Sequence, residues 1–231
     1  MNWFDTHILL FLNQLMNHWP WFDWLVSRAY STNLIGCGTT MALAWWALFD
    51  REEEDQLSRG YELLLGASLF SGLAVLAARG LALSLPFRTR PVWTPALQFQ
   101  LPPGFHFPLL EWSSFPSDHA ALFYALATGI LFVSRPLGWL AIGWVATMIS
   151  FPALYLGIHW PTDVIAGACL GVGFAHCAKI RPVREAILRL TTSWRRQQPG
   201  LFFAVLFLWS YELVNLLEDG RRLLKGLWHL I

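Results

Sequence analysis

Charge is scarce in this sequence of 231 residues: Asp, Glu, Lys and Arg together make up 13% of it, against 55% hydrophobic residues. A soluble domain usually carries about twice that charged fraction, so the composition argues against a soluble protein. The net charge of +1 lacks the concentrated basic excess of a nucleic-acid binder, so no nucleic-acid partner is expected. The sequence also lacks internal repeats and any Pro/Gly/Ser-rich linker. Residues 1–231 are therefore predicted to form one domain.

Cysteine is rare as well, and no set of residues has convincing metal-ligand spacing, so neither a metal nor another cofactor is expected. The three cysteines lie in apolar stretches and are predicted to be small buried hydrophobic residues: Cys37, Cys169 and Cys177. Asn2, Asp5 and Asn13 interrupt the first apolar residues, and no early Lys or Arg precedes them. The N-terminus is therefore not expected to be a signal peptide.

Long apolar runs are abundant, in contrast to charge. A membrane-spanning helix needs about 20 mainly apolar residues. The fold class predicted is an all-α integral membrane bundle of about six spanning helices, near 32–49, 61–85, 118–134, 137–157, 163–180 and 200–217. Segment 3–28 differs because polar residues fall between apolar ones at helical spacing and Trp residues follow. It is predicted to be an interfacial amphipathic helix that precedes the bundle.

The distribution of basic residues predicts sidedness, because cytoplasmic loops are enriched in Lys and Arg. The connections rich in these residues lie near 50–60, 134–137 and 180–199. The alternate connections hold only Arg88 and Arg90. The alternate connections should thus face outward, toward the periplasm if the membrane is a bacterial inner membrane. The basic residues at 221–225 conflict with this scheme if the last predicted helix, near 200–217, spans the membrane.

His159 and Asp163 form the first candidate chemical motif. Pro161 is well suited to the first turn of a helix, and Asp163 follows His159 by four residues. That spacing can place the carboxylate beside the imidazole, so that one ring nitrogen holds a proton and the other is free to attack. The alternative is a helix-capping Asp with an interfacial His.

The sequence Pro116-Ser117-Asp118-His119 opens an apolar helix. A Ser cap leaves backbone N–H groups that can bind an anion, and His119 could protonate a leaving oxygen. An ordinary helix cap with a surface histidine is the alternative.

Arg88 and Arg90 lie just outside an apolar run and can converge on phosphate, or they can simply reach the membrane interface. All three motifs fall on the same predicted face of the membrane, which favours a shared site.

Together these motifs resemble the type 2 phosphatidic acid phosphatase family over roughly residues 60–180. The family pattern is Lys, six residues, Arg-Pro; then Pro-Ser-Gly-His; then Ser-Arg, five residues, His, three residues, Asp. The resemblance implies that His159 attacks phosphorus, Asp163 orients it and His119 protonates the departing group. It also implies that Arg90 and the amides around Ser117 and Asp118 bind phosphate.

The chain departs from this pattern at three positions. Asp118 stands where Gly is usual, and Leu83 stands where Lys is usual. Arg88 is expected to supply the lost positive charge from a different point. Ala153 stands where the family has an Arg that clamps phosphate, either by natural divergence or by an engineered substitution. Loss of one preorganised donor typically costs about 10²–10³ in rate, so Ala153 is expected to weaken activity.

The function predicted from this resemblance is a lipid phosphatase that hydrolyses a polyprenyl diphosphate, with undecaprenyl diphosphate first. Its partners would be the lipid phosphate substrate and membrane lipids. Two alternatives remain open: a phosphoryl or glycosyl-lipid transferase, and a lipid-phosphate binding or transport protein with little turnover. Arg79 inside the second apolar run, and His106 and Glu111 in the loop 86–117, are lesser candidates for functional residues.

Overall fold

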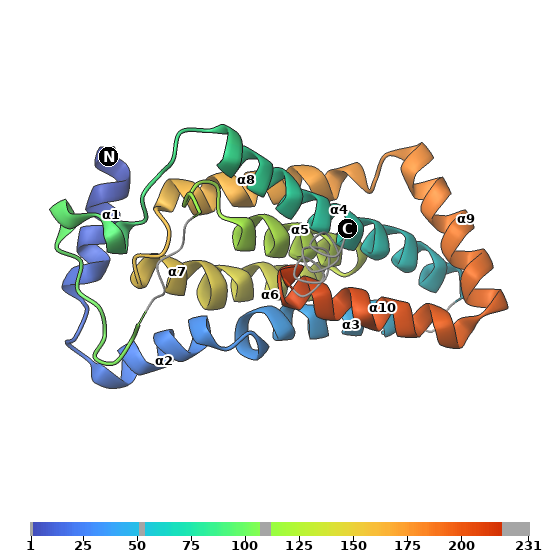
Figure 1. The fold of residues 1–231 in the computed structure, drawn as a ribbon. Helices are drawn as coiled ribbons and strands as arrows, with labels where there is room; N and C mark the ends of the chain where they lie inside the picture. Colours follow the sequence, from blue (N-terminus) through green and yellow to red (C-terminus); the bar gives the residue numbers. More distant parts are fainter. Residues whose placement is uncertain (1, 51–53, 107–111, 219–231) are drawn as a thin grey trace, which may run out of the picture.

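The computed structural model describes residues 2–50, 54–106 and 112–218, and over these ranges the chain is helical with no β-strand. The predicted all-α fold is confirmed for them. The elements, in chain order, are α1 (Trp3–Gln14), α2 (Pro20–Ser31), η1 (Leu34–Gly38), α3 (Thr39–Phe49), α4 (Glu54–Ser84), η2 (Pro91–Trp93), η3 (Pro95–Leu97), α5 (Asp118–Val133), α6 (Arg135–Val145), η4 (Ala146–Ser150), α7 (Phe151–Tyr155), α8 (Pro161–Cys177), α9 (Arg181–Gln197) and α10 (Pro199–Val214) (Figure 1).

Helix α5 lies at the centre of the bundle, in contact with α3, α4, α6 and α8. Its side chains face other helices on most sides, and several bulky apolar ones are fully buried: Leu122, Phe123, Leu126 and Ile130. Close van der Waals packing of such side chains against neighbouring helices holds a helix in place even where lipid replaces water. The first turn of α5, which holds a predicted site motif, is therefore anchored by the core of the molecule.

Two glycines bring α8 unusually close to α5. A Cβ atom at Gly167 would lie 2.3 Å from the carbonyl oxygen of Ser117, and one at Gly171 would lie 2.1 Å from that of Ala121. Only residues without a Cβ fit at these positions. The close approach also sets the two helix starts side by side, because the backbone amide of Ser117 donates a hydrogen bond to the carbonyl of Asp163 at 3.1 Å.

All six segments predicted to span the membrane are helical, but they differ in length. Two are long and apolar enough to cross a membrane, Leu63–Ser84 and Arg135–Tyr155. Helices α8 and α9 would form a third such segment only as a pair bent by 70°. The remaining apolar helices are shorter: Leu34–Phe49, Asp118–Val133 and Pro199–Val214. The chain thus has two or three candidate spans by length and composition, and a total of six remains a prediction.

The N-terminal segment differs from the single amphipathic helix predicted over 3–28. It forms two helices, α1 and α2, and Asn17 between them has a left-handed backbone with φ of 65°. Polar residues of both helices face the protein: Asp5 and Asp23 are almost fully buried, and the amide of Asn13 donates a hydrogen bond to the carbonyl of Gln100 at 2.9 Å. Of the polar side chains that suggested a face in water, Asn13 is buried against the loop at Gln100, whereas Gln14, Asn17 and His18 are exposed.

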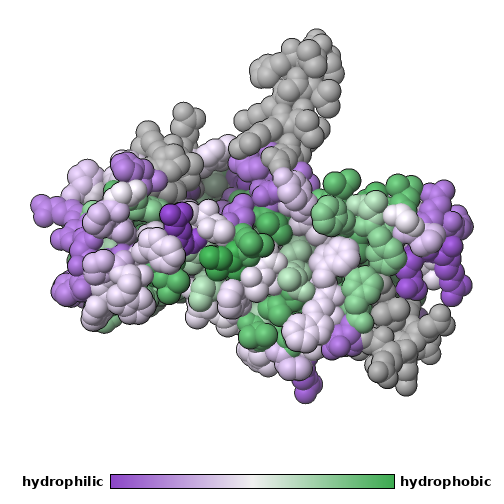
Figure 2. Space-filling model, turned by 90° about the horizontal axis from the view of Figure 1, so that it is seen from below, coloured by the Kyte–Doolittle hydropathy of each residue, from purple (hydrophilic) through white to green (hydrophobic). Residues whose placement is uncertain are grey.

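The loop after α4 and the α7–α8 connection lie at one end of the bundle together with α1, and α9 crosses the opposite end (Figure 1). The face in Figure 2 has hydrophobic residues gathered over its middle and hydrophilic residues toward both ends. This pattern suits a bundle whose middle lies in lipid. The cysteine prediction holds for Cys37, which is buried, but Cys169 is exposed and Cys177 is half-buried, since both lie away from the face of α8 that packs on α5.

Candidate active site

The three sequence motifs meet at the end of the bundle where α5 and α8 begin. His119 lies in the first turn of α5, His159 lies in the short connection before α8, and Arg90 follows α4. Each helix start is fixed locally: the Ser117 hydroxyl accepts a hydrogen bond from the amide of Ala120, at 3.3 Å. Pro161 begins α8, a position where the missing N–H costs nothing.

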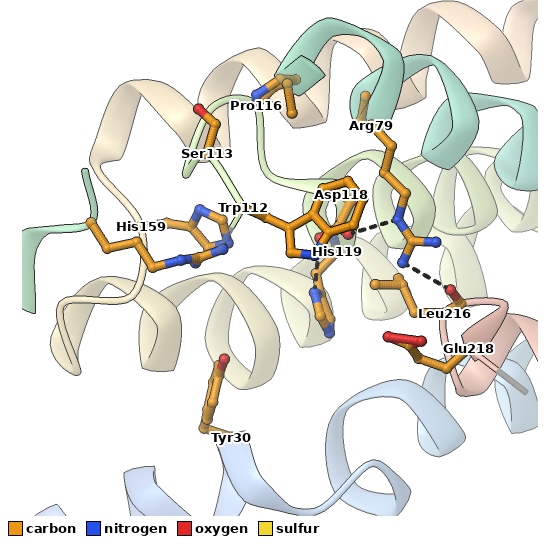
Figure 3. Close-up of a pocket in the computed structure, with 13 residues that line it drawn as sticks. Tyr30, Arg79, Trp112, Ser113, Pro116, Asp118, His119, His159, Leu216 and Glu218 are labelled. Carbon is orange, nitrogen blue, oxygen red and sulfur yellow. Dashed lines mark hydrogen bonds and ion pairs between the residues drawn. The ribbon is translucent and has the colours of Figure 1, made fainter. Parts of the chain in front are cut away.

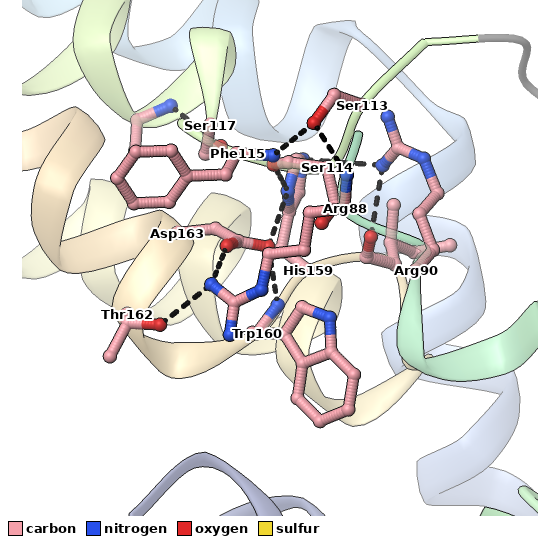
Figure 4. Close-up of polar contacts among 12 residues, drawn as sticks. Arg88, Arg90, Ser113, Ser114, Phe115, Ser117, His159, Trp160, Thr162 and Asp163 are labelled. Carbon is pink, nitrogen blue, oxygen red and sulfur yellow. Dashed lines mark hydrogen bonds and ion pairs between the residues drawn. The ribbon is translucent and has the colours of Figure 1, made fainter. Parts of the chain in front are cut away.

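His159 is held in one orientation by contacts on both sides of its ring (Figure 4). It is 6% exposed, and its Nδ1 lies 2.9 Å from the carbonyl oxygen of Ser114. Because a carbonyl can only accept, we assign the proton to Nδ1. Its Nε2 then presents a lone pair, 3.5 Å from Nη1 of Arg90. Burial lowers the pKa of His159, which favours the neutral imidazole that a nucleophile requires.

Asp163 is beside His159, as its spacing predicts, but it is not the nearest partner of the imidazole. Its Oδ2 is 3.6 Å from Nδ1 of His159 and accepts a hydrogen bond from the backbone amide of Trp160 at 2.8 Å. Its Oδ1 is bound by Arg88. The Ser114 carbonyl therefore fixes the ring, while the fully buried Asp163 carboxylate supplies negative charge next to it.

Arg88 occupies a different place from the one expected of a phosphate ligand. Its guanidinium binds two fully buried carboxylates, Asp163 and Asp5, and it donates to the Thr162 hydroxyl at 2.8 Å. It also lies over the Trp160 ring, 5.2 Å from the centroid. Arg88 is not among the residues that line the cavity beside His159. Its partners make it a link between α1, the loop after α4 and the start of α8.

A cavity of about 230 Å³ adjoins His159 and holds the second histidine (Figure 3). The polar and charged residues that line it come from six parts of the chain: Tyr30, Arg79, Arg90, Ser113, Asp118, His119, His159 and Glu218. His119 is 40% exposed, and its Nδ1 lies 3.2 Å from Oδ1 of Asp118. The two histidines predicted to act together thus face one cavity.

Arg90 is the buried cation next to His159. It is 8% exposed, and its Nη1 donates to the carbonyl of Ile158 at 2.9 Å. Burial lowers the pKa of Arg90, but a guanidinium remains protonated in proteins. Its position beside Nε2 of His159 is the one expected of a phosphate-binding residue.

The backbone amides predicted to bind phosphate are largely engaged within the protein. The amide of Ser117 donates to the carbonyl of Asp163, and the amide of His119 donates to Oδ1 of Asp118 at 2.9 Å. Ser117 is 2% exposed and does not line the cavity, so its role is to cap α5. Asp118 does line it, through its side chain, and that carboxylate lies 3.4 Å from Nε of Arg79.

Ala153 lies close to the histidines. It is buried, and it lines a small recess that also contacts His119 and His159. Its carbonyl accepts hydrogen bonds from the amides of Ile158 and His159, at 2.8 and 3.2 Å. An arginine at this position would therefore lie next to both histidines, where the family pattern implies a phosphate clamp.

The lesser candidates have different outcomes. Arg79 lines the cavity, whereas the exposed His106 contacts the carbonyl of Gly104 and is absent from that lining. Glu111 lies outside the described residues. Across the part of the chain that the structure describes, no cluster of three His, Cys, Asp or Glu side chains is placed to hold a metal ion.

Sequence reasoning missed several residues that shape the site. Asp5 accepts hydrogen bonds from the amide and the hydroxyl of Thr162, at 2.9 and 2.7 Å, in addition to binding Arg88. The sequence signal that could have marked Asp5 is a single carboxylate within a mainly apolar helix. Tyr30 lines the cavity, and burial raises its pKa, so it stays a neutral phenol. Nothing in the local sequence marks Tyr30, because only the packing of α2 brings it to the cavity.

Comparison with known proteins decides the family. The model of the PAP2 superfamily matches residues 61–185, which is more than half of the chain. The chain belongs to the PAP2 superfamily. The resemblance seen in the three motifs is thereby confirmed, and the matched range contains every predicted site residue. No solved structure matches the chain significantly.

Relatives of this PAP2 protein match a shorter stretch. The chain is 40% identical over 60 residues to the bacitracin transport permease protein BcrC of Bacillus licheniformis, covering 26% of the chain and 29% of the relative. It is 40% identical over 58 residues to an undecaprenyl-diphosphatase of Sulfolobus acidocaldarius, covering 25% and 28%. It is 44% identical over 59 residues to a lipid A 4'-phosphatase of Bacteroides thetaiotaomicron, covering 25% and 26%. The alignments thus span less than a third of each relative.

Proposed function

We propose that this PAP2 protein is a membrane lipid phosphatase that hydrolyses a polyprenyl diphosphate, undecaprenyl diphosphate above all. The observation that carries the proposal is the setting of His159: its Nδ1 donates to a carbonyl and its Nε2 lies beside the Arg90 guanidinium, in the cavity that also holds His119. Nε2 has the lone pair to attack phosphorus, and Arg90 has the charge to bind phosphate oxygens.

The reaction proposed has two steps. First, Nε2 of His159 forms a bond to the terminal phosphorus while the bridging P–O bond breaks, and His119 gives its proton to the departing oxygen. Second, His119 takes a proton from water, which attacks the phosphohistidine and releases inorganic phosphate. Asp163, 3.6 Å from Nδ1, stabilises the positive charge that the imidazole acquires in the first step.

The setting in the membrane supports an amphiphilic substrate. The cavity is lined by His119 and His159, which lie where α5 and α8 begin, and two segments of the described chain are apolar and long enough to span a membrane. A lipid chain could lie among the helices while its head group enters the cavity. The proposed location is a bacterial inner membrane with the site facing outward, which is supported by the basic residues near α9, at the opposite end.

The relatives favour this substrate class without fixing one lipid, since two of them are named phosphatases of different lipids. Ala153 is proposed to lower turnover, because it removes a guanidinium from beside the two histidines. The same missing guanidinium at position 153 supports the alternative, a binding or transport protein with little turnover.

The test is phosphate release from undecaprenyl diphosphate in detergent micelles by the chain itself and by its Ala153→Arg and His159→Asn variants. We expect the chain to release phosphate, Ala153→Arg to release it faster, and His159→Asn to release none. An acid-labile phosphoryl label on His159 should be trapped during turnover. Absence of activity and label in both the chain and Ala153→Arg would refute the phosphatase and favour a binding protein. Label without phosphate release, discharged only when an acceptor is added, would indicate a transferase.

A further inference from the structure

Arg79 stands apart from the residues that the proposed reaction uses. It lies on α4, within Leu63–Ser84, a segment apolar enough to cross a membrane, and its side chain is 16% exposed. An arginine in such a segment is costly unless it is paired or serves a function. Its guanidinium reaches the cavity that holds both histidines.

The contacts of Arg79 hold it in place without exhausting its donors. Its Nε lies 3.4 Å from Oδ2 of Asp118, and its Nη2 donates to the carbonyl of Leu216 at 3.1 Å (Figure 3). A guanidinium has further N–H groups, and the distance to Asp118 is long for a charge-assisted hydrogen bond. Other N–H groups therefore remain to bind an anion in the cavity.

The position of Arg79 relative to His159 indicates which phosphate it would bind. Figure 3 shows His159 and Arg79 at opposite sides of the cavity, with His119 between them. Arg90 is already beside His159, so the phosphate under attack belongs on that side. His119 is the proton donor for the bridging oxygen in the proposed reaction. The group beyond that oxygen, toward Arg79, is the leaving group.

We propose that Arg79 binds the phosphate of the leaving group and thereby selects diphosphate monoesters over monophosphate monoesters. This inference rests on the proposed phosphatase function. When a diphosphate is cleaved, the leaving lipid monophosphate gains negative charge as the bridging bond breaks, and a preorganised guanidinium stabilises that charge. When a monophosphate is cleaved, the leaving group is an alcohol and offers Arg79 no phosphate.

The carboxylates around Arg79 agree with this role. Asp118 and Glu218 both line the cavity, and carboxylates repel a phosphate in the same space. The pairing of Arg79 with Asp118 reduces that repulsion where the second phosphate would lie. Arg79 would thus act twice, as a phosphate ligand and as the counter-charge of Asp118.

The experiment compares phosphate release from farnesyl diphosphate and from farnesyl monophosphate by the full-length protein and its Arg79→Gln variant. We expect kcat/KM for the diphosphate to fall about tenfold or more, and that for the monophosphate to change less than about threefold. Arg181→Gln is the matched control, because that arginine is exposed on α9 and pairs with Glu185. The control should leave both values unchanged. Equal losses on both substrates would overturn the proposal.

A second readout does not depend on turnover. Pyrophosphate should raise the unfolding temperature of the wild-type protein more than inorganic phosphate does, and Arg79→Gln should abolish most of that difference. If Arg79→Gln fails to fold because Asp118 loses its partner, the double variant Arg79→Gln/Asp118→Asn removes both charges and serves instead. A wild-type protein that cleaves neither substrate would refute the proposed function. An undiminished pyrophosphate effect in the variants would refute the role of Arg79.

Discussion

Replacement of Arg88 by glutamine distinguishes two roles that the sequence and the structure suggest for this residue. If Arg88 binds phosphate, as the motif Arg88-Thr89-Arg90 suggests, Arg88→Gln should raise KM and leave the folded protein as stable as before. In the structure, however, Arg88 joins Asp5 and Asp163, whose side chains have no exposed surface. We therefore expect Arg88→Gln chiefly to destabilise the protein.

The expected magnitude follows from the two carboxylates that lose their cation. Breaking a buried ion pair by removing one partner costs about 3–5 kcal/mol. The Arg88 side chain is 27% exposed, so water can reach the vacated space and the lower value, about 3 kcal/mol, applies. For a chain of this size that loss lowers the unfolding temperature by roughly 6–12 °C. Activity should fall as well, because Asp163 then lacks a partner that holds it near His159.

Thermal unfolding of the purified protein in detergent, followed by tryptophan fluorescence, measures the effect. Arg28→Gln is the matched control: Arg28 lies over the ring of Trp24, 5.8 Å from its centroid, and should change stability by less than about 0.5 kcal/mol. The double variant Arg88→Gln/Asp5→Asn should be less destabilised than the sum of the single variants, because one unpaired charge is gone. An unfolding temperature within about 2 °C of wild type, together with a raised KM, would refute the structural role.

Three further outcomes are expected. Burial lowers the pKa of His159, so the neutral imidazole should persist below pH 6.5, the ordinary histidine value. The measured kcat/KM should therefore begin to fall only below that pH. A loss of kcat/KM on acidification with its midpoint above pH 6.5 would contradict this. Gly167→Ala should lower the free energy of unfolding by about 1–3 kcal/mol and reduce activity, because its Cβ would lie 2.3 Å from the Ser117 carbonyl oxygen and push α8 away from α5. Unchanged stability and activity would count against the packing described. Ala153→Arg should raise kcat about 10²–10³-fold in the phosphate-release assay, because it restores a guanidinium beside the histidines. It should also lower stability, because a long side chain enters a buried position. A rate no higher than wild type would show that another residue binds the phosphate in place of this arginine.

The sequence was sufficient for the helical fold class and for the grouping of the site. Apolar runs bounded by Pro, Ser and Gly locate the helices, because helix starts and stops are local events. The motifs around His119 and His159 fall at predicted helix starts on the same face of the membrane, which favours one shared site. The residues of the motifs alone therefore predicted a shared site, and their order matched the family.

Only the tertiary structure decided which partner each charged residue takes. Arg79 and Arg88 both lie near the end of an apolar run, and no local sequence pattern distinguishes them. In the structure Arg88 binds Asp5 and Asp163, whereas Arg79 lines the cavity. Those pairings join residues between 39 and 83 positions apart. They depend on the close contact of α5 with α8 and on the docking of α1, which are set by packing between helices and leave no periodic trace in the sequence.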